Sequence, residues 1–168
     1  MSPRVIGLDL SMTATGIAEA NGTTYTYAPG VKADNRLASI RKAVGLAVGQ
    51  GVDLVVIEDG VHRSLAAFDL GMVHGTIRMS LLSVGVRYVL VPPAALKKYA
   101  TGKGNATKPD MRMALYQRMG IDLRDDNQVD ATWLRYAGLE LLGQPVVDLP
   151  KAQVAALDKV RAAMAVAS

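Results

Sequence analysis

The sequence predicts an α/β fold in which a mixed five-stranded sheet is flanked by helices. Five short runs rich in β-branched and apolar residues indicate strands, and helical periodicity fills most of the chain after the third run. The length of 168 residues, half of them apolar, suffices for one domain with a sizeable core. No repeat, low-complexity tract or linker divides the sequence. We therefore expect residues 1–168 to form a single domain.

The first three predicted strands form an antiparallel meander. Residues 4–11 are an apolar run of strand length, and residues 15–20 and 23–27 are two more. Asn21-Gly22 separates the second run from the third, and this dipeptide is a strong signal for a two-residue hairpin turn. The three runs should therefore pair in sequence order.

Helices and strands alternate after the meander. The predicted elements are a helix at 34–49, a strand at 53–58, a helix at 64–84, a strand at 87–91, and helices at 93–99, 108–119, 127–142 and 150–165. Residues 101–107 form a loop, and Thr107 can cap the helix that follows. This order is that of the ribonuclease H-like arrangement, in which the first and fourth strands lie side by side. Their carboxyl ends then meet at the sheet edge where open α/β folds bind ligands.

Three acidic residues stand at the ends of segments that should be buried. Asp9 closes the first strand, Glu58 closes the fourth, and Asp130 opens an apolar helical run. A carboxylate at the edge of an apolar core is destabilising unless a cation compensates it. Singly, such acids would only mark strand ends and a helix start. Together they predict a site for two Mg²⁺ ions, for which Mn²⁺ can substitute, that assist phosphodiester cleavage.

Asn127 is the predicted fourth metal ligand. It lies three residues before Asp130, hence on the same helical face, where its amide oxygen would complete the set. Asp126 could also point toward that face. Asp125 and Asp126 have a structural alternative, however, because carboxylates at a helix start accept backbone hydrogen bonds and complement the helix dipole. The sequence therefore favours Asn127 and leaves Asp126 as the alternative.

Positive charge is concentrated in one segment. The chain carries a net charge of +4, yet residues 92–120 contain six basic residues and one acidic residue, a net charge of +5. A local basic field beside clustered carboxylates suits a polyanion brought to metal ions. A solubilising face, the alternative, would ordinarily mix both signs. The predicted DNA-binding residues are Lys97, Lys98, Lys103, Lys108 and Arg112.

Distinct motifs follow one another between about residues 4 and 140. They are Gly7-Leu8-Asp9-Leu10-Ser11 with Thr15-Gly16, Val56-Ile57-Glu58, Pro92-Pro93 leading to Leu96-Lys97-Lys98, Thr101-Gly102-Lys103-Gly104-Asn105-Ala106-Thr107-Lys108, and Val129-Asp130-Ala131. Together they resemble the successive motifs of the RuvC family of Holliday junction resolvases. The resemblance implies a homodimer that binds a four-way DNA junction and nicks two strands symmetrically with magnesium. It implies that Asp9, Glu58 and Asp130 are catalytic metal ligands and that Lys97 and Lys108 lie near the scissile phosphate, with Lys108 catalytic.

Two positions depart from the family pattern. The position three before the last acid, commonly Asp or His in the family, is Asn127 here. Cellular resolvases tend to carry an aromatic residue shortly after the second acid, whereas this chain has Val61 in a shortened loop. The compact length and altered loop suit a phage-encoded relative, which would act in the host cytoplasm.

The predicted helix at 64–84 carries two apolar stripes. One stripe is Phe68, Met72, Gly75, Met79 and Leu82, and the other is Leu70, Val73, Ile77, Leu81 and Val84. A helix on the surface of a sheet needs only one. The second stripe must be covered by the C-terminal helix or, as we favour, by a second copy of the chain, with Gly71 and Gly75 allowing close approach.

Composition disfavours other classes of protein. The absence of cysteine excludes a disulfide framework and a thiolate zinc site, and no signal peptide or membrane-spanning stretch is evident, so we expect a cytoplasmic protein. Two other functions on this fold remain open: a ribonuclease H-like nuclease for structured RNA, and a non-catalytic DNA-binding module. A sugar-kinase-like ATPase would need a longer chain with a two-domain cleft.

Overall fold

The computed structural model describes residues 2–49, 51–60 and 67–166. Its elements are β1 (Val5–Asp9), β2 (Thr15–Ala18), β3 (Thr24–Tyr27), α1 (Asn35–Val48), β4 (Leu54–Glu58), α2 (Ala67–Ser83), β5 (Tyr88–Val91), α3 (Pro93–Thr101), α4 (Lys108–Met119), α5 (Asp126–Leu141), α6 (Lys151–Val154), the 3₁₀ turn η1 (Ala155–Leu157) and α7 (Asp158–Val166). The strands and the helices before residue 150 lie where the sequence predicts them, within a few residues at each end.

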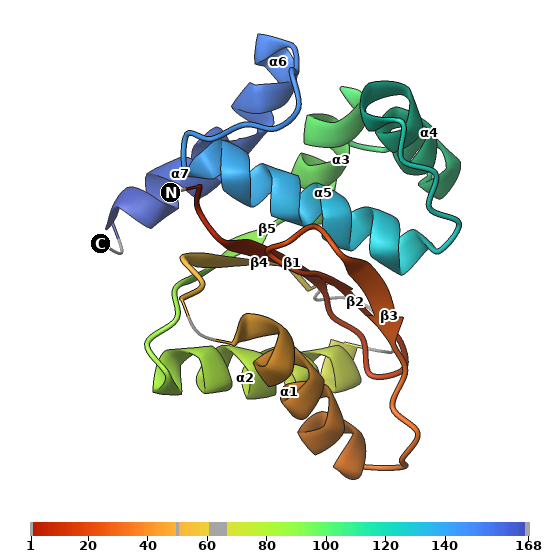
Figure 1. Ribbon diagram of the computed structural model, residues 1–168, viewed down its shortest axis with the longest axis vertical. Coiled ribbons are helices and arrows are strands. Elements are labelled where there is room, and N and C mark those ends of the chain that lie inside the picture. Colours follow the sequence, from red (N-terminus) through yellow and green to blue (C-terminus); the bar gives the residue numbers. More distant parts are fainter. Residues whose placement is uncertain (1, 50, 61–66, 167–168) are drawn as a thin grey trace.

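The strands form one mixed sheet in the order β3-β2-β1-β4-β5 (Figure 1). The first three pair antiparallel, whereas β4 pairs parallel with both β1 and β5. The register of the central pair sets Leu8 beside Ile57, so the next residues, Asp9 and Glu58, end adjacent strands at the same edge. The predicted mixed α/β arrangement, with the first and fourth strands as neighbours, is confirmed.

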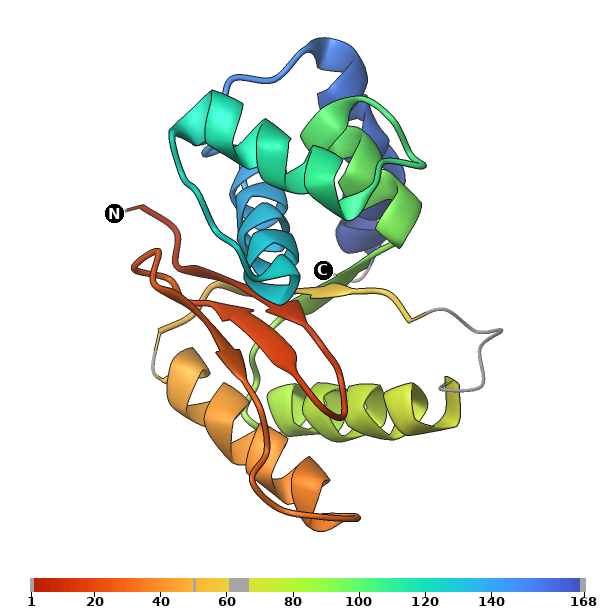
Figure 2. The same cartoon turned by 90° about the vertical axis from the view of Figure 1, so that its right-hand side faces the viewer.

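Helices cover both faces of the sheet. Helices α1 and α2 lie on one face, and α3 to α7 lie on the other (Figures 1 and 2). On the first face Ile6 and Leu8 of β1 pack with Ile40 of α1 and Ile77 of α2. Because successive strand residues point to opposite faces, Val5 belongs to the core on the other side.

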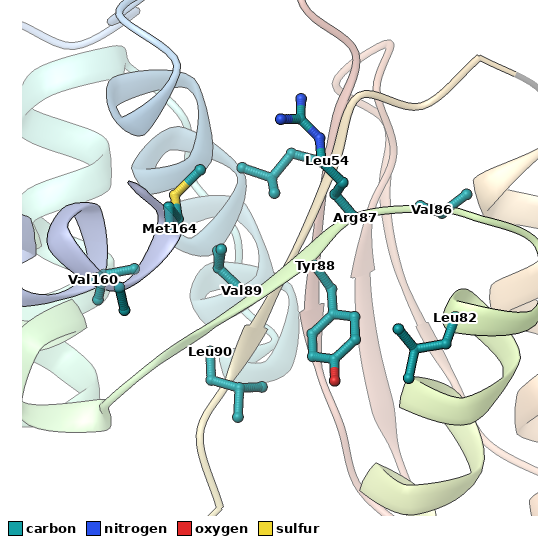
Figure 3. A pocket seen from close by; sticks show the side chains of 10 residues that line it. Leu54, Leu82, Val86, Arg87, Tyr88, Val89, Leu90, Val160 and Met164 are labelled. Atoms are coloured by element: carbon teal, nitrogen blue, oxygen red, sulfur yellow. The ribbon is translucent and has the colours of Figure 1, made fainter. Parts of the chain in front are cut away.

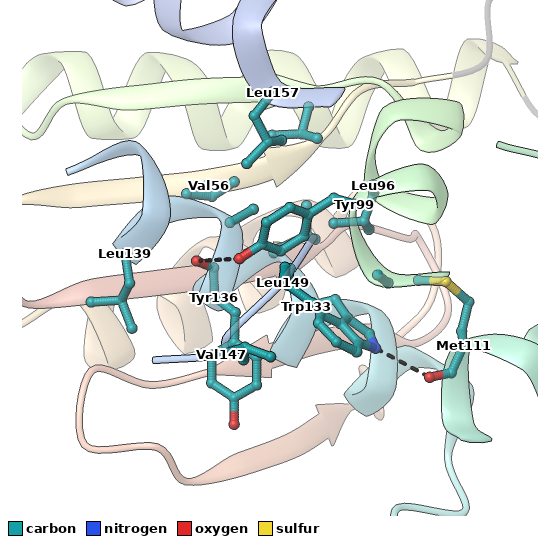
Figure 4. Packing of buried hydrophobic residues seen from close by; sticks show 14 of the residues in the cluster. Val56, Leu96, Tyr99, Met111, Trp133, Tyr136, Leu139, Val147, Leu149 and Leu157 are labelled. Atoms are coloured by element: carbon teal, nitrogen blue, oxygen red, sulfur yellow. Dashed lines mark hydrogen bonds between the residues drawn. The ribbon is translucent and has the colours of Figure 1, made fainter. Parts of the chain in front are cut away.

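Buried aromatic residues tie α3, α4 and α5 together (Figure 4). The fully buried Trp133 of α5 donates a hydrogen bond from Nε1 to the carbonyl oxygen of Met111 in α4, at 3.1 Å. The hydroxyl of Tyr99 in α3 donates to the carbonyl oxygen of Tyr136 in α5, at 3.3 Å. These contacts fix the three helices that carry the basic segment and Asp130.

The C-terminal segment differs from the prediction of one helix over 150–165. It forms α6, the tighter turn η1 and then α7. The Gln153 side chain is buried, donates to the carbonyl oxygen of Tyr99 at 2.7 Å and accepts from Arg118 at 3.0 Å. Leu157 is fully buried and Val160 packs in the same core. With the helix broken here, Gln153 meets α3 and α4 while Leu157 and Val160 enter the hydrophobic core.

Helix α2 buries one of its two stripes. Val73, Ile77 and Leu81 face the sheet, whereas Phe68 is 76% exposed and Met79 is 67% exposed. The alternative that the C-terminal helix covers the outer stripe is wrong, because α7 packs with the core on the opposite face of the sheet.

Some predictions fall outside the described residues. These are the start of the predicted helix at 64–66 and the shortened loop with Val61. In the ranges that the structure does describe, no helix is long and apolar enough to cross a membrane.

Candidate active site

Three elements bring the predicted acids to one edge of the sheet. Asp9 and Glu58 end the adjacent parallel strands β1 and β4, and Asp130 follows the first turn of α5. Helix α5 starts where it does because Asp125 caps it: its carboxylate accepts hydrogen bonds from the backbone N–H groups of Asn127 and Gln128. We call Asp9, Glu58 and Asp130 the acid centre.

Glycines in β1 and β2 let α5 lie directly on the sheet. A Cβ atom added to Gly7 would lie 2.0 Å from the carbonyl oxygen of Ala131, and one added to Gly16 would lie 2.1 Å from that of Asn127. Any larger residue at either position would push the helix away. Gly7, two residues before Asp9, and Gly16 are therefore what allows the first turns of α5 to reach the strand ends.

Burial raises the pKa of every carboxyl group in the acid centre, and repulsion within the centre raises those of Asp9 and Glu58 further. The pKa of Asp9 rises to about 8, mainly by burial and then through the negative charges of Glu58 and Asp130. The pKa of Glu58 rises to about 7, by burial and the charge of Asp130. Burial also raises the pKa of Asp130 to about 6. Ionising all three groups at neutral pH therefore requires added positive charge nearby.

Two lysines lie close enough to supply part of that charge. Lys108 opposes the rise in the pKa of Asp9 and Asp130, and Lys97 opposes the rise for Glu58 and Asp130. Neither lysine pairs with these acids. Among the described residues the ion pairs are Lys108–Asp126, Arg112–Asp122 and Arg161–Asp158, so the acid centre has no direct cationic partner there.

The acid centre suits Mg²⁺ by its donor chemistry. Three carboxylates without a cationic partner in the described chain, with the amide of Asn127 one helical turn before Asp130, are the hard oxygen ligands this ion prefers. Within the described ranges, however, no group of three or more acidic or histidine side chains could hold a metal ion as they lie. The backbone thus brings the acids to one edge without gathering their oxygens around a single point.

The alternatives for the fourth ligand have different neighbours. Asp126 forms an ion pair with Lys108, with 3.1 Å between Oδ2 and Nζ. The hydrogen bond in this pair is the main reason that the pKa of Lys108 is raised. Asp125 serves as the helix cap and also accepts a hydrogen bond from Thr26 at 2.8 Å. Asp125 and Asp126 thus each have a structural partner, and Asn127 stays the predicted fourth ligand.

The remaining basic residues differ in whether they form ion pairs. Lys98 and Lys103 are exposed on α3 and the loop after it, and neither is in an ion pair of the described chain. Arg112 of α4, by contrast, donates from Nε and Nη2 to Asp122 at 2.9 and 2.6 Å. The sequence prediction missed the partners of Arg112 and Lys108. It also did not single out Tyr116, whose spacing of four residues from Arg112 indicates a shared helix face.

An apolar groove runs along the edge strand β5 (Figure 3). Its volume is about 490 Å³, and it is lined by Leu54, Leu82, Val86, Arg87, Tyr88, Val89, Leu90, Val160, Ala163 and Met164. None of the acid centre lines it. The groove therefore has no part in the chemistry of the acids.

The sheet of three antiparallel strands followed by two parallel strands, flanked by helices, is a ribonuclease H-like fold. Within that class the chain has a RuvC-like fold. It is similar to the Thermus thermophilus RuvC structure, with a TM-score of 0.66 and 19% identity over 86% of this chain and 99% of that chain. It is equally similar to T. thermophilus RuvC in complex with a Holliday junction substrate, with a TM-score of 0.67 and 18% identity over 87% and 99% of the two chains.

The resemblance to RuvC inferred from motifs is confirmed at the level of the fold. No family model matches the sequence, and no curated protein matches it. The expected phage origin finds no support in these comparisons. The roles of individual residues therefore depend on the geometry of this chain.

Proposed function

We propose that this protein is a metal-dependent endonuclease that cleaves branched DNA at four-way junctions. The observation that carries the proposal is the acid centre, Asp9, Glu58 and Asp130, whose raised pKa values reflect uncompensated burial beside Lys97 and Lys108. The similar T. thermophilus RuvC fold, solved with a Holliday junction substrate, supports the choice of substrate.

The proposed roles follow from the donor groups. Asp9, Glu58, Asp130 and Asn127 would hold two Mg²⁺ ions, or Mn²⁺ in their place. When bound, the ions lower the pKa of a nucleophilic water and stabilise the leaving oxygen. Lys108 would hold a phosphate oxygen of the scissile group, since its ammonium is exposed and is steadied by Asp126 at 3.1 Å.

The basic segment would hold the DNA on either side of the cut. Lys97, Lys98 and Lys103 come from α3 and the loop that follows it, and Lys108 and Arg112 come from α4. Contacts of this kind release counterions from the DNA, so binding should weaken steeply as salt rises. Arg112 would contribute least, because Asp122 already holds it.

A homodimer through α2 would supply two active sites for paired, symmetric nicks. The outer stripe of α2 offers an apolar surface for a second copy, with Phe68, Met79 and Leu82 exposed by 76%, 67% and 62%. A Cβ atom added to Gly71 or Gly75 would meet nothing within 4 Å, so the helix surface between them is open to close approach.

Cleavage of labelled substrates tests the proposal. A four-way junction, a fork, duplex DNA and structured RNA are incubated with and without Mg²⁺, using the wild type, Asp9→Asn and the control Asp148→Asn, whose side chain is exposed. We expect the wild type and the control to cut the junction only with Mg²⁺, and Asp9→Asn to bind it without cutting. Preferential cutting of RNA would favour an RNA nuclease. Junction binding by the wild type without any cutting would favour a non-catalytic module.

A further inference from the structure

A cavity beside α4 shares Lys108 with the proposed active site, but none of the acid centre lines it. Its volume is about 700 Å³, which lies within the roughly 300–1,000 Å³ typical of small-ligand sites. The residues that line it are Lys108, Pro109, Arg112, Met113, Tyr116, Asp122 and Asp126. We call it the α4 cavity.

Two large side chains in the α4 cavity are left open to solvent. Tyr116 is 54% exposed and Met113 is 53% exposed, three residues apart on one face of α4. In the described chain the Tyr116 ring takes part in none of the aromatic or cation–π contacts. A free ring beside a thioether offers a flat apolar surface of the kind on which planar rings stack.

The charges around the α4 cavity cancel. Lys108 pairs with Asp126 at 3.1 Å, and Arg112 pairs with Asp122 at 2.6 Å. A phosphate inside the cavity would meet both carboxylates, whereas a neutral ring would meet no net charge. The same four groups offer donors and acceptors to the polar edge of such a ring. Charge complementarity therefore favours a nucleobase over a phosphate.

The position of the α4 cavity links it to the strand that would be cut. Asp126 lines the cavity, and Asp130 of the acid centre lies four residues further along α5, about 6 Å at 1.5 Å per residue. Lys108 also lines the cavity, and its charge acts on Asp9 and Asp130. A strand with a phosphate at the acid centre would thus present a neighbouring base to the cavity.

We propose that the α4 cavity is a subsite for one unstacked base of the cut DNA strand, with that base lying against the ring of Tyr116. The identity of the strand rests on the proposed function. The stacking contact itself depends only on the cavity, because a base stacks on an exposed aromatic ring with little regard to sequence. Tyr116 would then position the nucleotide beside the scissile phosphate.

Photo-cross-linking tests the subsite without relying on cleavage. A single-stranded oligonucleotide containing 5-iodouracil is irradiated with the metal-free protein, and the modified peptide is mapped by mass spectrometry. We expect the adduct on Tyr116 in the wild type and its loss in Tyr116→Ala. The affinity of Tyr116→Ala for the same oligonucleotide should fall about tenfold. Tyr116→Phe, which keeps the ring, should retain both the adduct and the affinity.

A matched control and a separate cleavage assay make the result decisive. Leu46→Ala removes an apolar side chain that is 75% exposed on α1, on the other face of the sheet. It should change neither the Tyr116 adduct nor the affinity for the oligonucleotide. An adduct mapped away from Tyr116, or a Tyr116→Ala protein with unchanged affinity, would overturn the subsite. A wild type that forms the Tyr116 adduct but cuts no branched DNA would overturn the proposed function alone. A wild type that cuts junctions without the adduct would overturn the subsite alone.

Discussion

Replacing Asp9 by asparagine should stabilise the metal-free protein. The carboxyl group of Asp9 is buried beside two other acids, and its pKa is about 8 against 3.8 for a free side chain. A pKa raised by folding favours the protonated folded state. Its contribution to stability is therefore fully present below pH 3.8 and is lost as the pH rises through about 8. Asparagine does not ionise, so the stability of the variant relative to the wild type should increase as the pH rises.

The size of the gain follows from the shift in pKa. At pH 7 the pH exceeds the free-side-chain value of 3.8 by about three units, which at 1.36 kcal/mol per unit sets an upper limit of about 4 kcal/mol. Water at the sheet edge relaxes around the charge, so we expect about 1–3 kcal/mol. For a chain of 168 residues this raises Tm by roughly 5 °C.

Thermal and urea unfolding in EDTA at pH 5, 7 and 8 measure this effect. The gap between Asp9→Asn and the wild type should widen with pH, whereas the control Asp148→Asn, an exposed acid, should follow the wild type throughout. Added Mg²⁺ should stabilise the wild type more than Asp9→Asn. A variant that is no more stable than the wild type at pH 8, or a gap that does not change with pH, would refute the electrostatic reasoning.

Three further predictions concern activity and assembly. Lys108→Ala should slow junction cleavage by about tenfold or more and weaken binding much less, because the ammonium lies beside the acid centre; equal losses in kcat and Kd would contradict this. Met79→Asp changes a side chain that is 67% exposed, so it should leave the Tm of the subunit within about 2 °C yet yield monomers in sedimentation. A monomeric wild type at micromolar concentration, with or without junction, would remove the dimer. Asn127→Asp should lower the Mg²⁺ concentration needed for cleavage and Asn127→Ala should raise it, since a carboxylate binds the ion more tightly than an amide. A cleavage-dead but folded Asp126→Ala beside an unaffected Asn127→Ala would reassign the fourth ligand.

Local sequence patterns were enough to predict the strands, their pairing and the helix caps. The run that ends at Asp9 and the run that ends at Glu58 each form a strand, and the two strands pair in parallel as expected. Thr107 caps α4, with Asp110 returning the hydrogen bond in a capping box. Such features depend on residues close together in the chain, so local sequence patterns predict them.

Contacts between distant segments were not predictable in the same way. The break at residues 155–157 follows from Gln153 and Leu157 meeting the core built by α3 and α5, and no local signal marks it. Both stripes of α2 have the same apolar character. Only the packing of the sheet decided that Val73 and Ile77 are buried while Met79 is exposed.

For the candidate site, the sequence by itself determined which strand ends carry acids and which segment is basic. Only the tertiary structure decided that α5 lies on Gly7 and Gly16, that Lys108 pairs with Asp126, and that the ring of Tyr116 stands open beside that pair. The physical reason is range. Strand patterns, caps and charge runs act over a few residues, whereas ion pairing, pKa shifts and cavities depend on side chains that only the folded chain brings together.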